Sequence, residues 1–458
     1  MRAWALAGSG LAVMLAVSWW EILFLPLGDS HDGRIHGRFG LQVRNLLEGG
    51  LVDSSFLSSM EPFATQPYAH HPPLTNVIHA TIGWLFGIGE WQLHLPGFLA
   101  GLATVGALIW LLRELGLGSW VAVGATGLVA STPMFWIYAR LGLGISLMLG
   151  FLALWVRRDR LAQPDRWLIV AGAATAFASW PGAALVVVVG VWGRRRLETR
   201  RLAGLVLTTA AVAIGVTLLW ALTTSSFSEL TGHTADRVRI PVTIGEFVDQ
   251  YRWFYQTLYP AWFRWSIPFA LAASVVSPRT RLPAVALAGV MIAWTVALPE
   301  AAFVHDFWTY PLIAPIALGW AAILDWLAGQ PVPSLLVAVG VGVLVLGSFA
   351  STQRGGFREA YFHAPSDGGA LVRSVAPADG QEIAWVLGSI EVPRWLSYYW
   401  DLPTHKIEEP DLDSVPGGDR VLLRLDRTPA WLPAVPAPEA QAGRYVVVRA
   451  SDLQSVEP

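Results

Sequence analysis

Long apolar segments follow one another over the first 350 residues of the chain. A helix of roughly twenty apolar residues is long enough to cross a bilayer. We therefore predict an all-α polytopic membrane protein with about eleven transmembrane helices. The block 167–193 could be one stretch or a pair of helices, and Trp180-Pro181-Gly182 favours a turn. The predicted spans cover 3–26, 92–112, 118–138, 141–156, 167–179, 181–193, 202–223, 262–277, 282–299, 307–327 and 332–350.

The arginines predict how these spans are oriented, because short cytoplasmic loops carry an excess of basic residues. If the N-terminus is cytoplasmic, the arginines of the short loops all fall on the cytoplasmic side. They are Arg2, Arg113, the groups Arg157 to Arg166 and Arg194 to Arg201, and the pair Arg279 and Arg281. The opposite, outer face then receives the loops 27–91 and 224–261, the turn 299–306 and the C-terminal tail. The polar residues that could carry chemistry lie on that outer face.

The first outer loop contains two segments that are apolar but too short to span a bilayer. Residues 37–48 and 74–86 are predicted as helices that lie along the membrane interface, where an apolar side meets lipid and a polar side meets water. They belong to the predicted transmembrane domain, residues 1–352.

Beyond residue 352 the charge rises and the apolar runs shorten. Short β-branched and aromatic runs favour strands. We predict a small extracytoplasmic α/β domain over 353–458, with strands at 382–387, 420–425 and 444–449 and a helix at 393–400.

Composition supports the membrane assignment and excludes some functions. Hydrophobic residues make up 54% of the chain, charged residues 14%, and the mean hydropathy is +0.48. The net charge of -2 gives no basis for nucleic-acid binding. Because cysteine is absent, disulfides and thiolate chemistry are excluded. The apolar segment from Ala3 to Leu25 is too long for a signal-peptide core, so it is expected to remain as the first span.

Asp32 is the first candidate for chemistry. A carboxylate placed where a membrane helix meets water can accept a proton from a hydroxyl presented at the bilayer surface. The alternative is a structural role, in which Asp29, Ser30 or Asp32 caps the following helix. The loop offers two aspartates, so both roles can be filled.

The segment His70-His71-Pro72-Pro73 is the second candidate. Two prolines hold the backbone extended and present the imidazoles rigidly. Imidazoles can bind a phosphate or a divalent metal, although surface histidines are commonly inert. No spacing of a known metal motif is present, so we assign no metal ligands and no cofactor, while a divalent metal stays open.

Two further polar positions lie at the predicted outer ends of spans. Arg140 either snorkels to the interface or makes a bidentate contact with a lipid-linked phosphate. His305 and Asp306 stand beside Trp308 and Tyr310, which are typical of the aromatic belt at a membrane surface. An aromatic belt does not require an imidazole or a carboxylate, so His305 and Asp306 are candidate pocket residues.

The order of these segments resembles the type C glycosyltransferase superfold, and in it the bacterial relatives of protein O-mannosyltransferases and of the aminoarabinose transferase. The resemblance covers about residues 1–350. Its motifs are His31-Asp32-Gly33 followed by Val43-Arg44-Asn45-Leu46, then Tyr68-Ala-His-His-Pro-Pro-Leu74, and Ser131-Thr-Pro-Met-Phe-Trp-Ile-Tyr-Ala-Arg140. This chain departs from the family at His70-His71, where relatives often have Glu-Lys, and at His94, where relatives often have Arg. It also has Ile145 near a position where relatives often have Asp.

The resemblance implies an inverting transfer of a sugar from a polyprenyl phosphate to a hydroxyl of a lipid, glycan or protein. Asp32 would be the general base, and His71, Arg140 and His70 would bind the donor phosphate. The implied substrate pocket consists of Asp29, His31, Tyr68, His94, Tyr138, His305, Asp306 and Tyr310. It implies a bacterial inner-membrane location, with a neighbouring membrane protein as one further partner. The alternatives are a non-catalytic accessory subunit of the same fold and a transporter of a lipid-linked sugar.

Overall fold

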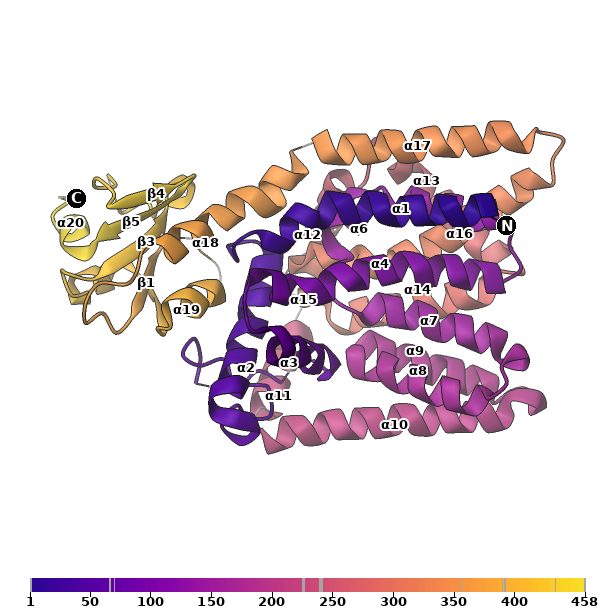
Figure 1. Ribbon diagram of the computed structural model, residues 1–458, viewed down its shortest axis with the longest axis horizontal. Helices are drawn as coiled ribbons and strands as arrows, with labels where there is room; N and C mark the ends of the chain where they lie inside the picture. Colours follow the sequence, from indigo (N-terminus) through magenta and orange to yellow (C-terminus); the bar gives the residue numbers. More distant parts are fainter. Residues whose placement is uncertain are drawn as a thin grey trace. The chain divides into compact units, whose positions relative to one another are not determined.

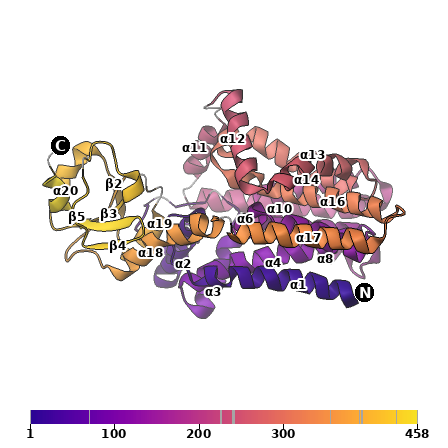
Figure 2. The same cartoon turned by 90° about the horizontal axis from the view of Figure 1, so that it is seen from above.

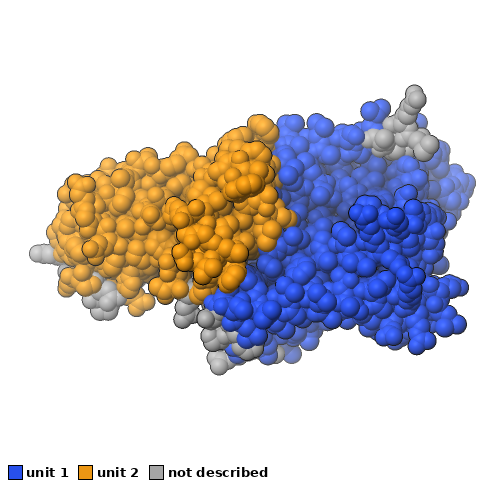
Figure 3. Space-filling model, turned by 60° about the horizontal axis from the view of Figure 1, so that its bottom comes forward, with its two compact units in different colours: residues 1–19, 69–75, 96–355 blue, residues 20–68, 76–95, 356–458 orange. Residues whose placement is uncertain are grey.

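A computed structural model describes residues 2–65, 67–69, 71–224, 227–238, 242–354, 356–388, 390, 393–432 and 434–456. The chain divides into two compact units, coloured separately in Figure 3. The first unit comprises Met1–Trp19, Ala69–Thr75 and Pro96–Gly355, and the second comprises Trp20–Tyr68, Asn76–Leu95 and Gly356–Pro458. Each unit is described by itself.

The first unit is built from helices, and every predicted apolar window contains one (Figure 1). The helices are most of α1 (Arg2–Trp20), the part of α4 (Glu90–Glu114) from Pro96 onward, α5 (Ser119–Ala130), α6 (Pro133–Tyr138), α7 (Gly144–Arg157), α8 (Pro164–Ala178), α9 (Trp180–Gly193), α10 (Arg200–Thr223), α13 (Ala261–Val276), α14 (Arg281–Ala297), α16 (Ile313–Ala328) and α17 (Ser334–Arg354). The second outer loop of the sequence prediction contains α11 (Phe227–Val238) and α12 (Ile244–Leu258). Short helical turns, α15 (Pro299–Val304) and the 3-10 segment η4 (Asp306–Leu312), precede α16.

The block 167–193 is a pair of helices, α8 and α9, as the Trp-Pro-Gly turn favoured. The hydroxyl of Ser179 caps α9 by accepting a hydrogen bond from the Gly182 amide at 3.0 Å. A Cβ at Gly182 would stand 2.2 Å from the carbonyl oxygen of Thr175, so only glycine fits this close approach. The pair packs beside α10 (Figure 1).

Among the described residues, five helices are long and apolar enough to cross a membrane: Leu6–Phe24, Glu90–Glu114, Leu197–Thr223, Asp306–Ala328 and Ser334–Arg354. The chain is therefore a multi-pass membrane protein. Shorter apolar helices include Leu74–Phe86, Ser119–Ala130, Trp180–Gly193, Ala261–Val276 and Arg281–Ala297. The count of eleven spans stays a prediction.

The second unit combines helices of the first polar loop with a small sheet. Its helices are α2 (His31–Asp53), most of α3 (Leu74–Phe86), α18 (Ala364–Ser374), α19 (Arg394–Trp400) and α20 (Ala450–Gln454). Its strands are β1 (Ala384–Leu387), β2 (Thr404–Ile407), β3 (Arg420–Arg424), β4 (Ala440–Ala442) and β5 (Tyr445–Arg449), in the order β2-β1-β3-β5-β4. Strand β1 is parallel to β2 and β3, whereas β5 is antiparallel to β3 and β4.

The three predicted strands correspond to β1, β3 and β5, and the predicted helix corresponds to α19. Strands β2 and β4 were missed because they are edge strands of only four and three residues, whose pairing is made in the tertiary structure. Side chains alternate between two faces of the sheet, so it has two cores. One core contains Val386, Leu422 and Val447 with residues of α18 and α19. The other contains Val421 and Val448 with Leu453 of α20. Figure 2 shows the strands of the sheet together with these helices.

The first of these cores extends to the first polar loop. Phe39 of α2 and Leu93 at the start of α4 are buried in the same cluster as Trp395 of α19. A Cβ at Gly37 would stand 2.8 Å from the amide nitrogen of Trp395, which shows how closely α2 approaches α19. The α/β residues thus pack directly on the helix that carries Asp32. A domain border after residue 352 and an interfacial position for α2 and α3 stay predictions.

Candidate active site

The N-terminus of α2 settles which residue caps the helix. Ser30 is the N-cap, and its hydroxyl oxygen accepts a hydrogen bond from the Gly33 amide at 2.8 Å. A Cβ at Gly33 would stand 2.3 Å from the carbonyl oxygen of Gly28, so the entry into the helix is a tight turn. Because Ser30 serves as the cap, the carboxylate of Asp32 does not have that role.

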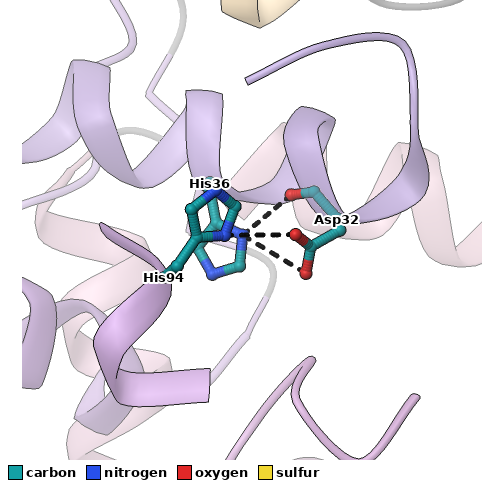
Figure 4. A group of neighbouring side chains, drawn as sticks. All are labelled: Asp32, His36 and His94. Atoms are coloured by element: carbon teal, nitrogen blue, oxygen red, sulfur yellow. Dashed lines mark hydrogen bonds and ion pairs between the residues drawn. The ribbon is translucent and has the colours of Figure 1, made fainter. Parts of the chain in front are cut away.

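Asp32 is buried, with 5% of its surface exposed, and it faces two histidines (Figure 4). The Nδ1 atom of His94 lies 3.1 Å from Oδ2 of Asp32. The Nδ1 atom of His36, one helical turn further along α2, lies 3.5 Å from Oδ1 and 2.9 Å from the backbone carbonyl oxygen of Asp32. The sequence prediction named Asp32 and His94, and the structure brings them into direct contact.

The ring nitrogen of His94 that points away from Asp32 is also engaged. Its Nε2 atom lies 3.3 Å from the carbonyl oxygen of Leu25. A carbonyl oxygen only accepts, so Nε2 carries the hydrogen of this bond. The other ring nitrogen, Nδ1, faces the carboxylate, and it carries either a lone pair or a second hydrogen.

Further aromatic rings enclose this group. The rings of His36 and His94 are 4.5 Å apart between centroids, and His79 of α3 lies 5.9 Å from His36. His79 stacks on Phe39 with centroids 3.9 Å apart. Sequence reasoning missed His36 and His79. The spacing of four residues between Asp32 and His36 was the available signal, since it places both on one helix face.

A small cavity borders Asp32 and His94. Its volume is about 10 Å³, which is room for a single water molecule or hydroxyl group rather than a sugar ring. Polar and apolar groups share its wall, which is lined by Ile22, Leu25, Pro26, Ser30, Asp32, Gly33, His94, Phe362 and Ser366.

Asp29, three residues before Asp32, has different neighbours. Its Oδ1 atom lies 3.2 Å from Nε of Arg34, and its Oδ2 atom lies 3.1 Å from a guanidinium nitrogen of Arg424 in β3. The hydroxyl of Tyr445 in β5 donates to the same Oδ2 at 3.5 Å. Burial raises the pKa of Tyr445, so this phenol stays protonated and able to donate. Asp29 therefore ties the loop to the sheet.

Arg424 extends this network outward. Its guanidinium also bonds Asp426, and these hydrogen bonds, with those from Arg444, lower the pKa of Asp426 to about 2. The chain Asp29, Arg424, Asp426, Arg444 alternates in charge, and it belongs entirely to the second unit.

Tyr68 lies between two arginines. The guanidinium carbon of Arg38 is 4.7 Å from its ring centroid, and that of Arg394 is 5.3 Å away. Arg38 is 8% exposed and was missed by sequence reasoning. His31 is half-buried at the start of α2, and the predicted phosphate ligand His70 lies outside the described residues.

Other predicted site residues belong to the first unit, where two of them meet. The hydroxyl of Tyr138 donates to Oδ2 of Asp306 at 2.5 Å. Tyr310 is buried, with its ring 6.4 Å from that of Phe135. His305 stacks on Phe307 with centroids 4.8 Å apart.

Arg140 does not snorkel. It is 2% exposed, and its guanidinium carbon lies 5.9 Å from the ring centroid of Trp19. The surface alternative for this residue is wrong, because its side chain is enclosed by protein. His71 is exposed. His71 and Arg140 belong to the first unit and Asp32 to the second, so a shared pocket stays a prediction.

Comparison with known proteins gives a result for the fold. No protein-family model matches the chain, and no curated protein matches it. Among solved structures, ArnT from Cupriavidus metallidurans bound to undecaprenyl phosphate matches with a TM-score of 0.60 at 18% identity, covering 98% of this chain and 99% of that one. The oligosaccharyltransferase AglB from Archaeoglobus fulgidus, in complex with an inhibitory peptide and a dolichol-phosphate, matches with a TM-score of 0.54 at 12% identity over 92% of this chain and 69% of that one. The chain has the type C glycosyltransferase fold. At these identities the likeness shows the fold alone, and the roles of individual residues depend on the geometry above.

Proposed function

We propose that this protein is an inverting glycosyltransferase of the bacterial inner membrane. It would move a sugar from a polyprenyl-phosphate donor to a hydroxyl of a lipid, glycan or protein at the outer face. The observation that carries the proposal is the buried Asp32, held against two imidazoles beside a cavity of hydroxyl size, in a chain with the type C fold.

The reaction needs a base at the acceptor and a cation at the leaving group. The acceptor oxygen attacks the anomeric carbon from the face opposite the phosphate, and its proton passes to the carboxylate of Asp32. The bond between the anomeric carbon and the phosphate oxygen breaks, and its electron pair leaves with the lipid phosphate. A positioned general base of this kind contributes roughly a hundredfold to ten-thousandfold in rate.

The residues proposed for the donor phosphate are Arg140, His71 and His70. Arg140 suits the role because a buried guanidinium presents a planar set of donors that matches phosphate oxygens. Tyr138, Asp306, His305 and Tyr310 of the first unit, and Asp29, His31, Tyr68 and His94 of the second, are proposed to line the substrate pocket. The contact between Tyr138 and Asp306 supports a polar surface within the first unit.

The proposed topology has eleven spans, a cytoplasmic N-terminus, and the chemistry and the α/β residues outside. The arginine-rich segments 157–166 and 194–201 support this orientation, since they connect apolar helices and would face the cytoplasm. Helices α2 and α3 would then lie at the outer surface, where a lipid-borne donor can approach from the membrane.

The test is transfer by the purified protein in lipid nanodiscs supplied with polyprenyl-phosphate sugars and membrane acceptors. We expect Asp32→Asn to lose transfer by at least a hundredfold while it still binds the donor lipid. The matched control is Asp53→Asn, an exposed aspartate at the end of the same helix α2. Transfer that survives in Asp32→Asn removes Asp32 from the mechanism. Movement of the lipid-linked sugar across the bilayer without transfer would identify a transporter instead.

A further inference from the structure

The group formed by Asp32, His36 and His94 has the form of a metal site. A carboxylate oxygen and one nitrogen from each histidine lie within 4.8 Å of one another, and all three residues are buried (Figure 4). In a zinc site each ligand lies about 2.0 to 2.2 Å from the ion, which puts neighbouring ligand atoms about 3.3 Å apart. The separation of 3.1 Å between Nδ1 of His94 and Oδ2 of Asp32 matches that spacing.

The second ring nitrogen of each histidine gives an independent observation. Histidines that bind metals commonly donate their other N–H to a carbonyl oxygen, which fixes the tautomer. His94 has this arrangement, because Nε2 donates to Leu25 and Nδ1 is left for the ion. In His36 the two nitrogens exchange roles. Its Nδ1 would donate a hydrogen to the carbonyl oxygen of Asp32 at 2.9 Å, which leaves the lone pair of Nε2 for the ion.

Electrostatics at the contact also requires a positive charge. A neutral His94 whose hydrogen is on Nε2 directs a lone pair from Nδ1 at the carboxylate, only 3.1 Å from Oδ2. An ionised carboxylate and a lone pair at that distance repel each other unless a proton or a cation lies between them. A bound ion would meet this requirement and would also take the lone pair on Nε2 of His36 as a ligand.

We propose that Asp32, His36 and His94 bind a single divalent transition-metal ion, with Zn²⁺ as the representative. Two imidazoles and one carboxylate favour such an ion over Mg²⁺ or Ca²⁺, which prefer oxygen ligands. Three protein ligands leave a fourth position open, and the cavity beside Asp32 and His94 has room for one water or hydroxyl there. Because a bound dication lowers the pKa of a hydroxyl in its open position, the site would assist the transfer. Only this last point rests on the proposed function.

The test measures the ion directly. Full-length protein in detergent is stripped with a chelator, titrated with Zn²⁺ by calorimetry, and assayed for zinc by mass spectrometry after desalting. We expect one zinc per chain, and at least tenfold weaker binding in His36→Gln, His94→Gln and Asp32→Asn. The matched control is His79→Gln, because His79 is equally buried beside His36 but stands outside the group. X-ray absorption of the zinc-loaded wild type should show two imidazoles and an oxygen ligand, whether or not the variants fold.

A wild-type protein that retains no zinc, or zinc retained equally by the three variants, overturns the inference and favours a shared proton. The two proposals fail separately. Glycosyl transfer by a chelator-treated protein that binds no zinc would contradict the metal site and leave the glycosyltransferase standing. Zinc bound at these residues in a protein that transfers no sugar would contradict the glycosyltransferase proposal and leave the metal site standing.

Discussion

Asp29 and Asp32 are two buried carboxylates three residues apart with opposite surroundings. Asp29 faces the permanent cations of Arg34 and Arg424, whereas Asp32 faces the imidazoles of His36 and His94. A guanidinium stays charged at any physiological pH, so the partners of Asp29 keep their charge. Imidazoles exchange protons or bind metals near neutral pH, so Asp32 has partners that can change state.

This difference separates a structural role from a chemical one within a single turn of chain. The side chain of Asp29 is 1% exposed and joins the loop to β3 and β5, which fixes where α2 begins. Asp32 borders a cavity that can admit a hydroxyl. We infer that the α/β residues serve the site by holding the N-terminus of α2 in place. The predictions below test this comparison.

The largest expected effect is on chemistry at Asp32. Asp32→Asn keeps the size of the side chain but removes the base, so transfer should fall by about a hundredfold to ten-thousandfold, with the melting temperature little changed. Initial rates in nanodiscs measure the first quantity, and thermal unfolding measures the second. If Asp32→Asn instead lowers the melting temperature but keeps the transfer rate of the wild type, Asp32 has the structural role that we assign to Asp29.

The next effect is on stability at Asp29. Arg424→Met removes one cation from a buried carboxylate that keeps Arg34, and the loss of one hydrogen bond to a charged group costs about 1.5 to 3 kcal/mol. The melting temperature should drop, and the double variant Asp29→Asn/Arg424→Met should recover part of the loss. Arg427→Met is the control, since Arg427 is exposed on the same segment. Equal melting temperatures for the two single variants would show that the pair does not anchor the loop.

A smaller effect is expected for the orientation of Asp32. His94→Phe keeps a ring in place but removes the contacts to Asp32 and to the Leu25 carbonyl, so transfer should fall by about tenfold to a hundredfold. His79→Phe should change transfer less, because its described ring contacts are stacking on Phe39 and proximity to His36. Equal losses in both variants would show that packing of the rings, rather than the contact with Asp32, is what matters.

The smallest expected effect is on how the melting temperature changes at low pH, and it concerns Asp426, which is linked to Asp29 through Arg424. Hydrogen bonds from Arg424 and Arg444 lower the pKa of Asp426 from 3.8 to about 2. A lowered folded-state pKa means that the stabilisation is complete above pH 4 and is lost as the pH falls towards 2. Asp426 is 43% exposed, so solvent screens the gain. Melting temperatures of wild type and Asp426→Asn should differ above pH 4 and converge near pH 2. Parallel curves would show that the pair contributes nothing.

Much of the fold could be predicted from the sequence because it depends on local patterns. The apolar windows contain helices, α3 has the predicted bounds, and β1, β3 and β5 were found from their β-branched runs. The edge strands β2 and β4 were not, because a segment of three or four residues without a β-branched or aromatic run becomes a strand only when a neighbour pairs with it. Asp32 was identified by its position after the first span and by the resemblance.

The sequence by itself determined that this is a helical membrane protein with an acid after its first span, because hydropathy and helix periodicity are local properties. The tertiary structure decided which groups meet that acid. His36 comes from the same helix, but His94 reaches it from a separate helix some sixty residues later in the chain, and Arg424 reaches Asp29 from a strand almost four hundred residues away. Contacts at such separations depend on how the chain folds back on itself, which no local pattern encodes.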